Sequence, residues 1–162
     1  MKFQRLKPHR RETSRQTGST ISEFAPALFI LLFLCFFPLL DLLALCVSYG
    51  AGYSLNAAQV REAALLSYKE ARDNPEGAVA KVIPNKWRGS GLGAFVKVSG
   101  PILTRVTYSD AGAGKTVVVA TRMTVSPFLT IPVLPGVPGL SMPVTLTWQS
   151  ERPLEDSANA PP

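Results

Sequence analysis

The chain has 162 residues and a net charge of +6 at neutral pH, which leaves room for one modest domain beside a membrane segment. Its first 18 residues contain six Lys or Arg residues and one acid, so they carry +5 and the remaining residues carry only +1. Because a nucleic-acid-binding domain needs basic residues spread over its folded face, this distribution argues against a nucleic-acid partner.

The first predicted element is a long apolar helix that follows the basic leader, residues 1–18. Residues 24–49 contain one charged side chain, Asp41, and would form a helix of about 39 Å, longer than the roughly 30 Å hydrocarbon core of a bilayer. The basic residues precede this segment, so the positive-inside rule predicts a single-pass protein of the cytoplasmic membrane. Its N-terminus would lie in the cytoplasm and its C-terminal domain outside. The apolar segment is too long for a cleaved secretory signal peptide.

Proline, aspartate and glycine mark irregular points along this helix. Pro38 removes an N–H donor deep in the segment, and we expect a kink near residues 36–39. Asp41 is expected near the outer membrane interface, with its carboxylate in interfacial water or, alternatively, in a helix contact. Gly50 and Gly52 weaken the helix without ending it, so one long rod and two helices joined by a hinge both stay open.

The residues after the membrane segment continue in a helical pattern. Residues 56–72 are rich in strong helix formers, and Pro75 ends the helix because a residue before proline avoids helical φ and ψ. The candidates for its apolar stripe are Val60, Ala63 or Tyr68, Ala64 and Ala71. We therefore predict a transmembrane and continuing helix at 19–72, an extracytoplasmic region at 73–152 and a disordered tail at 153–162.

Beyond Pro84 the pattern changes from helical to β-branched and alternating. The predicted strands are residues 95–98, 104–108, 116–125 and 144–150. Residues 128–143 repeat proline, which lacks the donor for a ladder, so this stretch is an extended loop or an edge segment. The expected fold is α+β, with a small antiparallel sheet of about three to five strands packed on the distal half of the long helix.

One motif suggests nucleotide binding, and we reject it. Residues 109–116, SDAGAGKT, nearly match a phosphate-binding loop, but Ser109 replaces the first glycine and Thr116 leads into a β-branched run where the motif needs a helix. Residues 110–114 are better interpreted as a hairpin turn. The single histidine, His9, lies in the leader and the two cysteines lie in the apolar segment, so we expect no enzyme, no metal site and no cofactor.

The segment from Gly18 to Phe24, GSTISEF, followed by a long apolar helix, resembles the start of proteins of the type IV pilin superfamily. The pair Glu23 and Phe24 and the alanine-rich residues 56–64 are similar to the TadE-like branch, the minor pilins or pseudopilins of tight-adherence pilus systems. Pro38 is similar to the helix-bending proline of many pilins. The resemblance covers about the first 65 residues, and the sheet region matches only in kind.

The resemblance implies that a prepilin peptidase cuts after Gly18 and that Ser19 becomes the new N-terminus. It gives Glu23, with Phe24 beside it, a role in assembly, and it implies three partners: the peptidase, other pilin-like subunits and the bilayer. A carboxylate at a membrane edge is costly unless it is paired, and a new α-ammonium group is a suitable partner. Thr20 and Glu23 also have capping-box spacing, which would suit a plain anchor helix.

Two functions stay open at this point. The first is a membrane-anchored pseudopilin that acts in assembly of a tight-adherence type IV pilus, and Asp41 and the prolines make its helix less uniform than that of a major pilin. The alternative is an uncleaved, single-pass, extracytoplasmic binding protein whose exposed sheet and proline-rich loop capture a ligand.

Overall fold

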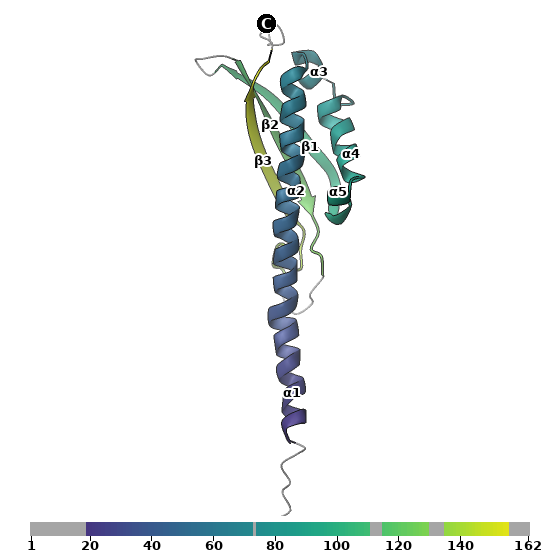
Figure 1. The fold of residues 1–162 in the computed structure, drawn as a ribbon, viewed down its shortest axis with the longest axis vertical. Coiled ribbons are helices and arrows are strands. Elements are labelled where there is room, and N and C mark those ends of the chain that lie inside the picture. Colours follow the sequence, from purple (N-terminus) through teal and green to yellow (C-terminus); the bar gives the residue numbers. More distant parts are fainter. Residues whose placement is uncertain (1–18, 73, 111–114, 130–134, 156–162) are drawn as a thin grey trace, which may run out of the picture.

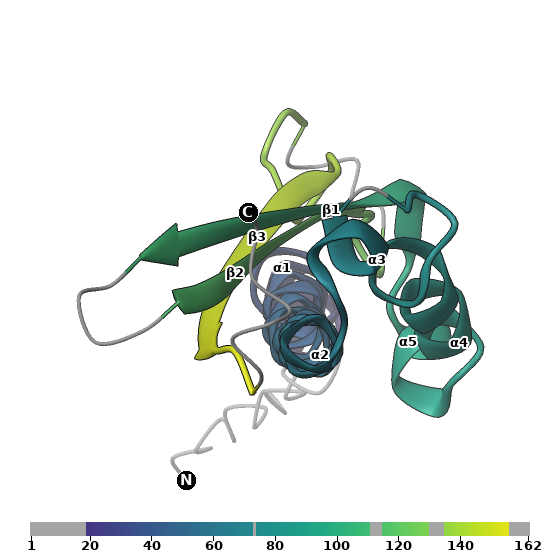
Figure 2. The same ribbon diagram turned by 90° about the horizontal axis from the view of Figure 1, so that it is seen from above.

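The computed structural model describes residues 19–72, 74–110, 115–129 and 135–155, which form a long helical rod with a sheet along its distal half (Figure 1). The helical elements are α1 (Ser19–Ile30), the π-helix η1 (Leu31–Phe36), α2 (Phe37–Leu65), α3 (Tyr68–Arg72), the π-helix η2 (Ala78–Val82), α4 (Ile83–Arg88) and α5 (Gly91–Phe95). The strands are β1 (Val98–Asp110), β2 (Lys115–Val125) and β3 (Val144–Pro153). The sheet covers one side of α2, and the short helices gather beside β1 (Figure 2).

The sheet is antiparallel, with β2 between β1 and β3. Three predicted strands, at 104–108, 116–125 and 144–150, are confirmed, and three strands lie within the expected range for the described residues. The described parts of the proline-rich stretch 128–143 form turns and one isolated bridge, as its missing donors predict.

The predicted strand at residues 95–98 is wrong, because the short helix α5 ends at Phe95, residues 96 and 97 are irregular, and only Val98 belongs to a strand. The side chain of Ser90 caps α5 by accepting a hydrogen bond from Gly93 N at 3.2 Å. Gly93 also lies so close to Trp87 that a Cβ there would stand 1.9 Å from the Trp87 carbonyl oxygen. The cap and this close approach turn the chain into a helix, and β1 begins only at Val98.

The helices α1, η1 and α2 follow one another without a break to Leu65, so the choice between a rod and a hinge is decided in favour of the rod. Pro38 is the second residue of α2, two positions after the last residue of η1. Its ring would collide with the carbonyl of Leu34 in a regular helix, and a π-helical segment is a common response to such strain. The ribbon passes through this segment in one general direction (Figure 1).

The rod ends earlier than the predicted residue 72. Leu66 adopts an extended conformation, with φ −88° and ψ 156°, and terminates α2 after Leu65. Ser67 then starts a new helix, because its hydroxyl donates to the Glu70 carboxylate at 3.0 Å and its carbonyl accepts from Ala71 N at 2.9 Å. The serine and glutamate have capping-box spacing, a local start signal that overrides the continuous helical composition.

The core lies between α2 and the inner face of the sheet, and it has two clusters. The cluster nearer the end of α2 contains Val60, Ala63, Ala64, Ala71, Val79, Val106, Val117 and Val119. The other cluster contains Ala51, Val96, Met123, Val125 and Trp148. The predicted apolar stripe is thereby confirmed for its four aliphatic members, and the sheet packs one face on the helix as expected.

A buried polar network crosses the same interface. Asn56, Gln59 and Thr121 are fully buried. The Thr121 hydroxyl donates to Gln59 Oε1 at 2.6 Å and accepts from Asn56 Nδ2 at 2.9 Å. Asn56 also donates to the Val119 carbonyl at 2.9 Å, and Gln59 to the Val79 carbonyl at 2.7 Å. Since buried polar groups are costly when unpaired, these bonds fix the register of α2 on the sheet.

Thr121→Val is expected to destabilise the protein by about 1–3 kcal/mol, because it removes one donor and one acceptor from buried amides while keeping the side-chain shape. The free energy of unfolding, measured in detergent with chemical denaturant, checks this. Thr145→Val is the matched control, because Thr145 is exposed and its hydroxyl bonds to that of its half-buried pair partner, Thr124, at 3.1 Å. Equal losses in the two variants would show that the network has no special weight.

Two glycines of α2 offer a second matched pair. A Cβ on Gly52 would lie 2.4 Å from two ring atoms of Trp148 and 2.8 Å from Met123 Cε, whereas a Cβ on Gly50 would meet nothing within 4 Å. We expect Gly50→Ala to stabilise the fold by up to about 1 kcal/mol through helix propensity. Gly52→Ala is expected to destabilise it by about 1–3 kcal/mol through overpacking. Thermal unfolding would contradict the packing argument if both substitutions raised Tm.

Candidate functional site

The first candidate is the part of the rod that no other element covers. None of residues 24–40 is buried, and Phe24 and Leu39 are 64% and 63% exposed. These 17 residues rise about 26 Å along the helix axis. Among the described residues, one helix, Phe24–Leu65, is long and apolar enough to cross a membrane. An apolar helix without protein cover needs lipid or other helices around it.

Aromatic side chains follow one another along this uncovered part. The rings of Phe29 and Phe33 stack with centroids 4.3 Å apart, and Phe33 meets Phe37 edge to face at 5.2 Å. Residues four apart share a helix face, so the three rings form a row. The row makes one side of the rod bulkier and more rigid than the others.

The sequence-predicted site residues lie at the near end of this rod. Ser19 is the first residue of α1 and Glu23 lies one helical turn later in the same element. Phe24 follows and is exposed. Gly18 lies outside the described residues. The geometry thus places Ser19, Glu23 and Phe24 on one helix and leaves their predicted roles as predictions.

Asp41 is the first buried residue along the rod, and sequence reasoning missed its environment. It is 1% exposed, and its Oδ1 accepts a hydrogen bond from Leu129 N at 2.7 Å. The expectation that this carboxylate reaches interfacial water is therefore wrong. The segment after β2, residues 126–129, covers it, because this part of the chain runs down beside α2 (Figure 1).

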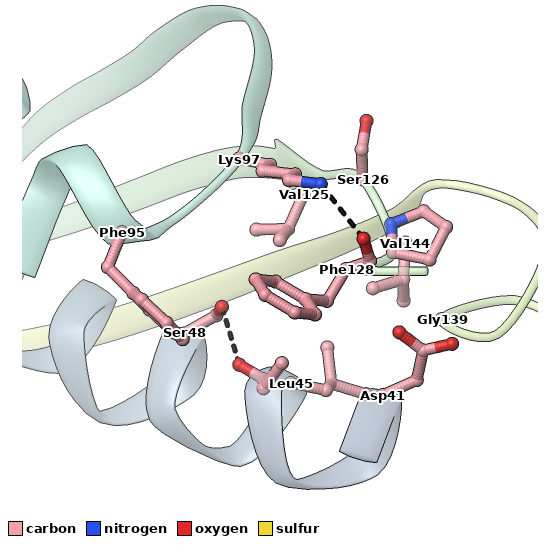
Figure 3. Close-up of a pocket in the computed structure, with 12 residues that line it drawn as sticks. Asp41, Leu45, Ser48, Phe95, Lys97, Val125, Ser126, Phe128, Gly139 and Val144 are labelled. Atoms are coloured by element: carbon pink, nitrogen blue, oxygen red, sulfur yellow. Dashed lines mark hydrogen bonds between the residues drawn. The ribbon is translucent and has the colours of Figure 1, made fainter. Parts of the chain in front are cut away.

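The covering segment is held from a second direction by Lys97. Its Nζ donates to the Phe128 carbonyl at 2.8 Å and lies 4.9 Å from the centroid of the Phe128 ring. Figure 3 shows this bond, with the Phe128 ring between Lys97 and the helix. The Phe128 carbonyl and the Leu129 N–H belong to one peptide group, so this group accepts from the ammonium and donates to the carboxylate. We call this arrangement the Asp41–Lys97 clamp.

The clamp lies in a pocket between the rod, the end of α5 and the two ends of the covering loop (Figure 3). The pocket is lined by Asp41, Ala44, Leu45, Ser48, Phe95, Lys97, Val125, Ser126, Pro127, Phe128, Gly139 and Val144. Asp41 Oδ2 is buried there and makes no hydrogen bond within the described part of the chain. Hydrogen bonds to charged groups are the stronger ones, so the clamp fixes the lowest part of the sheet to the helix.

The other predicted and rejected motifs are also located. Ser109 pairs with Thr116 and Asp110 with Lys115 across β1 and β2, which agrees with a hairpin at residues 109–116 and leaves no helix after the lysine. Residues 111–114 lie outside the described part. Within the described ranges, no three His, Cys, Asp or Glu side chains lie together as metal ligands. Cys35 and Cys46 are free and exposed.

A signal for the buried face of α2 does exist in the sequence. The buried residues of this helix are Asp41, Ser48, Ala51, Gly52, Leu55, Asn56, Gln59, Val60, Ala63 and Ala64. They recur at intervals of three, four and seven, which is the spacing of one helix face. Most are small or polar, so a search for apolar residues alone passes over them.

Comparison with known protein families, with characterised proteins and with solved structures found no match.

Asp41→Ala is expected to speed hydrogen exchange at the Leu129 amide by about tenfold or more, since a bond to a charged group contributes about 1.5–3 kcal/mol. Asp41→Asn keeps an acceptor oxygen and is expected to keep most of the protection. Exchange of the full chain in detergent, read by NMR or mass spectrometry, checks this. Leu42→Ala, at an exposed neighbour, is the control. Unchanged protection of the Leu129 amide in Asp41→Ala would show that the carboxylate does not hold the covering segment on the helix.

Proposed function

We propose that the protein is a membrane-anchored pseudopilin, a TadE-like minor pilin that acts in assembly of a tight-adherence type IV pilus. The observation that carries the proposal is the uncovered apolar rod at residues 24–40, which continues without a break into the helix that supports the sheet. Such a rod suits a subunit that is stored in a bilayer and then packs its helix against other helices. The sheet and the polar network hold the soluble domain to the same helix.

Processing after Gly18 by a prepilin peptidase fits the distribution of charge. The leader carries +5, and its removal leaves a subunit of +1. A basic segment anchors the uncleaved chain on the cytoplasmic side, whereas a filament of closely packed helices disfavours a block of like charges. Cleavage would thus change the protein from an anchored precursor to a subunit that can leave the membrane.

Glu23 would then pair with an α-ammonium group at Ser19 of its own or a neighbouring chain. Both groups belong to the first turns of α1, at the edge of the apolar rod. A charge at the edge of the membrane carries a desolvation cost that is offset only when its partner is present. The pair would therefore favour those contacts between subunits that bring the two charges together. The rest of the near rod offers apolar surface and the row of phenylalanines for helix packing.

The alternative is an uncleaved anchored binding protein whose exposed sheet and proline-rich loop capture a ligand. The Asp41–Lys97 clamp holds the start of this loop on the helix. This contact favours a loop with a structural role at the base of the soluble domain. The next experiment distinguishes the two functions, because the alternative requires a chain that keeps its leader.

The intact mass of the protein from cells that contain the peptidase tests processing. We expect the mass of a chain that begins at Ser19, apart from any N-terminal methylation, because the peptidase would cut the bond after Gly18. A Gly18→Leu variant should keep the leader and serve as the uncleaved standard. A wild-type chain that still begins at Met1 would support the anchored binding protein.

Glu23→Ala is expected to leave membrane insertion intact and to reduce pilus assembly strongly, because the carboxylate is lost while the apolar rod remains. Membrane fractionation and counting of pili by electron microscopy check the two expectations. Thr20→Ala is the matched control, since it weakens the capping box and keeps the acid. Equal defects in the two variants would reduce Glu23 to a cap, and normal piliation in Glu23→Ala would exclude its assembly role.

A further inference from the structure

The level at which the bilayer would end can be located on the helix. A hydrocarbon core of roughly 30 Å needs about 20 residues of helix. Counted from Phe24, where the polar first turns end, this level falls near Leu43. The uncovered part of the rod stops at Leu40, three residues short of it. The soluble domain therefore begins within the last turn of the membrane segment.

Two contacts place parts of the soluble domain at this level. Leu129 N bonds to Asp41, just below it. Gly139 lies against Leu45, just above it, where a Cβ on the glycine would stand 3.2 Å from Leu45 Cδ2. Both ends of the loop between β2 and β3 thus reach the depth at which lipid chains give way to headgroups.

Four side chains at this end of the domain are large, apolar and exposed. They are Phe95, Phe128, Val137 and Met142, with 45%, 43%, 38% and 49% of their surface exposed. We call them the apolar rim. The Phe95 and Phe128 rings stack at 5.9 Å, and hydrogen bonds from the Ser141 and Met142 amides to the Val137 carbonyl close a compact turn around Gly139.

The sequence of the loop is unusual for a water-exposed connection. No charged residue occurs between Arg122 and Glu151, and residues 127–143 are mostly proline and aliphatic or aromatic side chains. Surface loops are ordinarily polar, and contiguous exposed apolar groups mark an interaction surface. The nearest cation, Lys97, is exposed and lies over the Phe128 ring, where its remaining donors can reach a lipid phosphate.

We propose that the apolar rim inserts into the outer boundary of the bilayer, so that the domain rests on the lipid surface through these four side chains. The inference rests on the membrane anchor of the proposed function and extends it. The clamp then has a second role: its loop shields Asp41 from lipid on one side and offers apolar side chains to lipid on the other. The rim also makes up for the shortness of the uncovered rod, since a short span leaves a mismatch that must be compensated.

Depth-dependent fluorescence quenching tests the rim in the full chain, reconstituted in vesicles of phosphatidylethanolamine and phosphatidylglycerol. Val137→Cys and Met142→Cys, made in a Cys35→Ala, Cys46→Ala background, carry an environment-sensitive label. Leu65→Cys in the same background is the control, because Leu65 is exposed at the far end of α2. Cys35 alone, in Cys46→Ala, reports whether the rod lies in the bilayer. Lipids with a quencher near the top of the acyl chain, for the rim labels, and lipids with a quencher deep in the acyl chain, for Cys35, are each compared with unmodified lipids.

We expect the labels at residues 137 and 142 to be blue-shifted and quenched several-fold more strongly than the label at residue 65. Quenching equal to that at residue 65, with Cys35 quenched, would overturn the rim and leave the anchor intact. An unquenched Cys35 would overturn the anchor and the rim together. A blue shift without lipid quenching would overturn the lipid contact and would identify a protein, such as a second copy, as the cover. Circular dichroism of each variant confirms that it is folded.

Discussion

A single uninterrupted helix has to satisfy two different surroundings, and the rest of the structure depends on how it does so. Residues 24–40 of the helix are left uncovered by the other described elements, and none of them carries a charged side chain. From Asp41 onward one face is buried under the sheet, and that face is built from small and polar residues. The change occurs within one turn, at a carboxylate that could not face lipid without a large cost. Asp41 is tolerated there because the soluble domain comes down to meet it.

The Asp41–Lys97 clamp and the polar network around Gln59 both hold other parts of the chain against the long helix, at two different positions along it. Each gives hydrogen bonds to buried polar side chains, although Asp41 Oδ2 and Asn56 Oδ1 have no partner among the described residues, and each joins the helix to residues far away in the sequence. Between them Gly52 lets Trp148 lie directly on the helix backbone. The sheet is therefore held at several points, which keeps one face of the helix closed. The opposite face and the whole near end stay available for lipid or for other subunits.

Local patterns in the sequence were enough for the elements that local forces determine. The β-branched runs at 116–125 and 144–150 became strands, and the alanine-rich stripe near Ala64 became the core of the helix. The same patterns failed where a local signal was overlooked, as with the Ser67 and Glu70 pair, or where distant residues decide the outcome. Asp41 and Leu129 are 88 residues apart, so no window of sequence reveals that contact. At the candidate site, composition was enough to predict the apolar rod, whereas the clamp required the fold.

The proposed function requires the uncovered rod to be a surface for other pilin-like helices. A photo-crosslinking residue in place of Leu39 tests this requirement in cells that are assembling pili. Leu39 lies two residues before Asp41 and is 63% exposed. We expect crosslinked adducts with another small membrane-anchored subunit. These adducts should disappear when cleavage after Gly18 is blocked. Adducts with lipid alone, in cells that make normal pili, would contradict it.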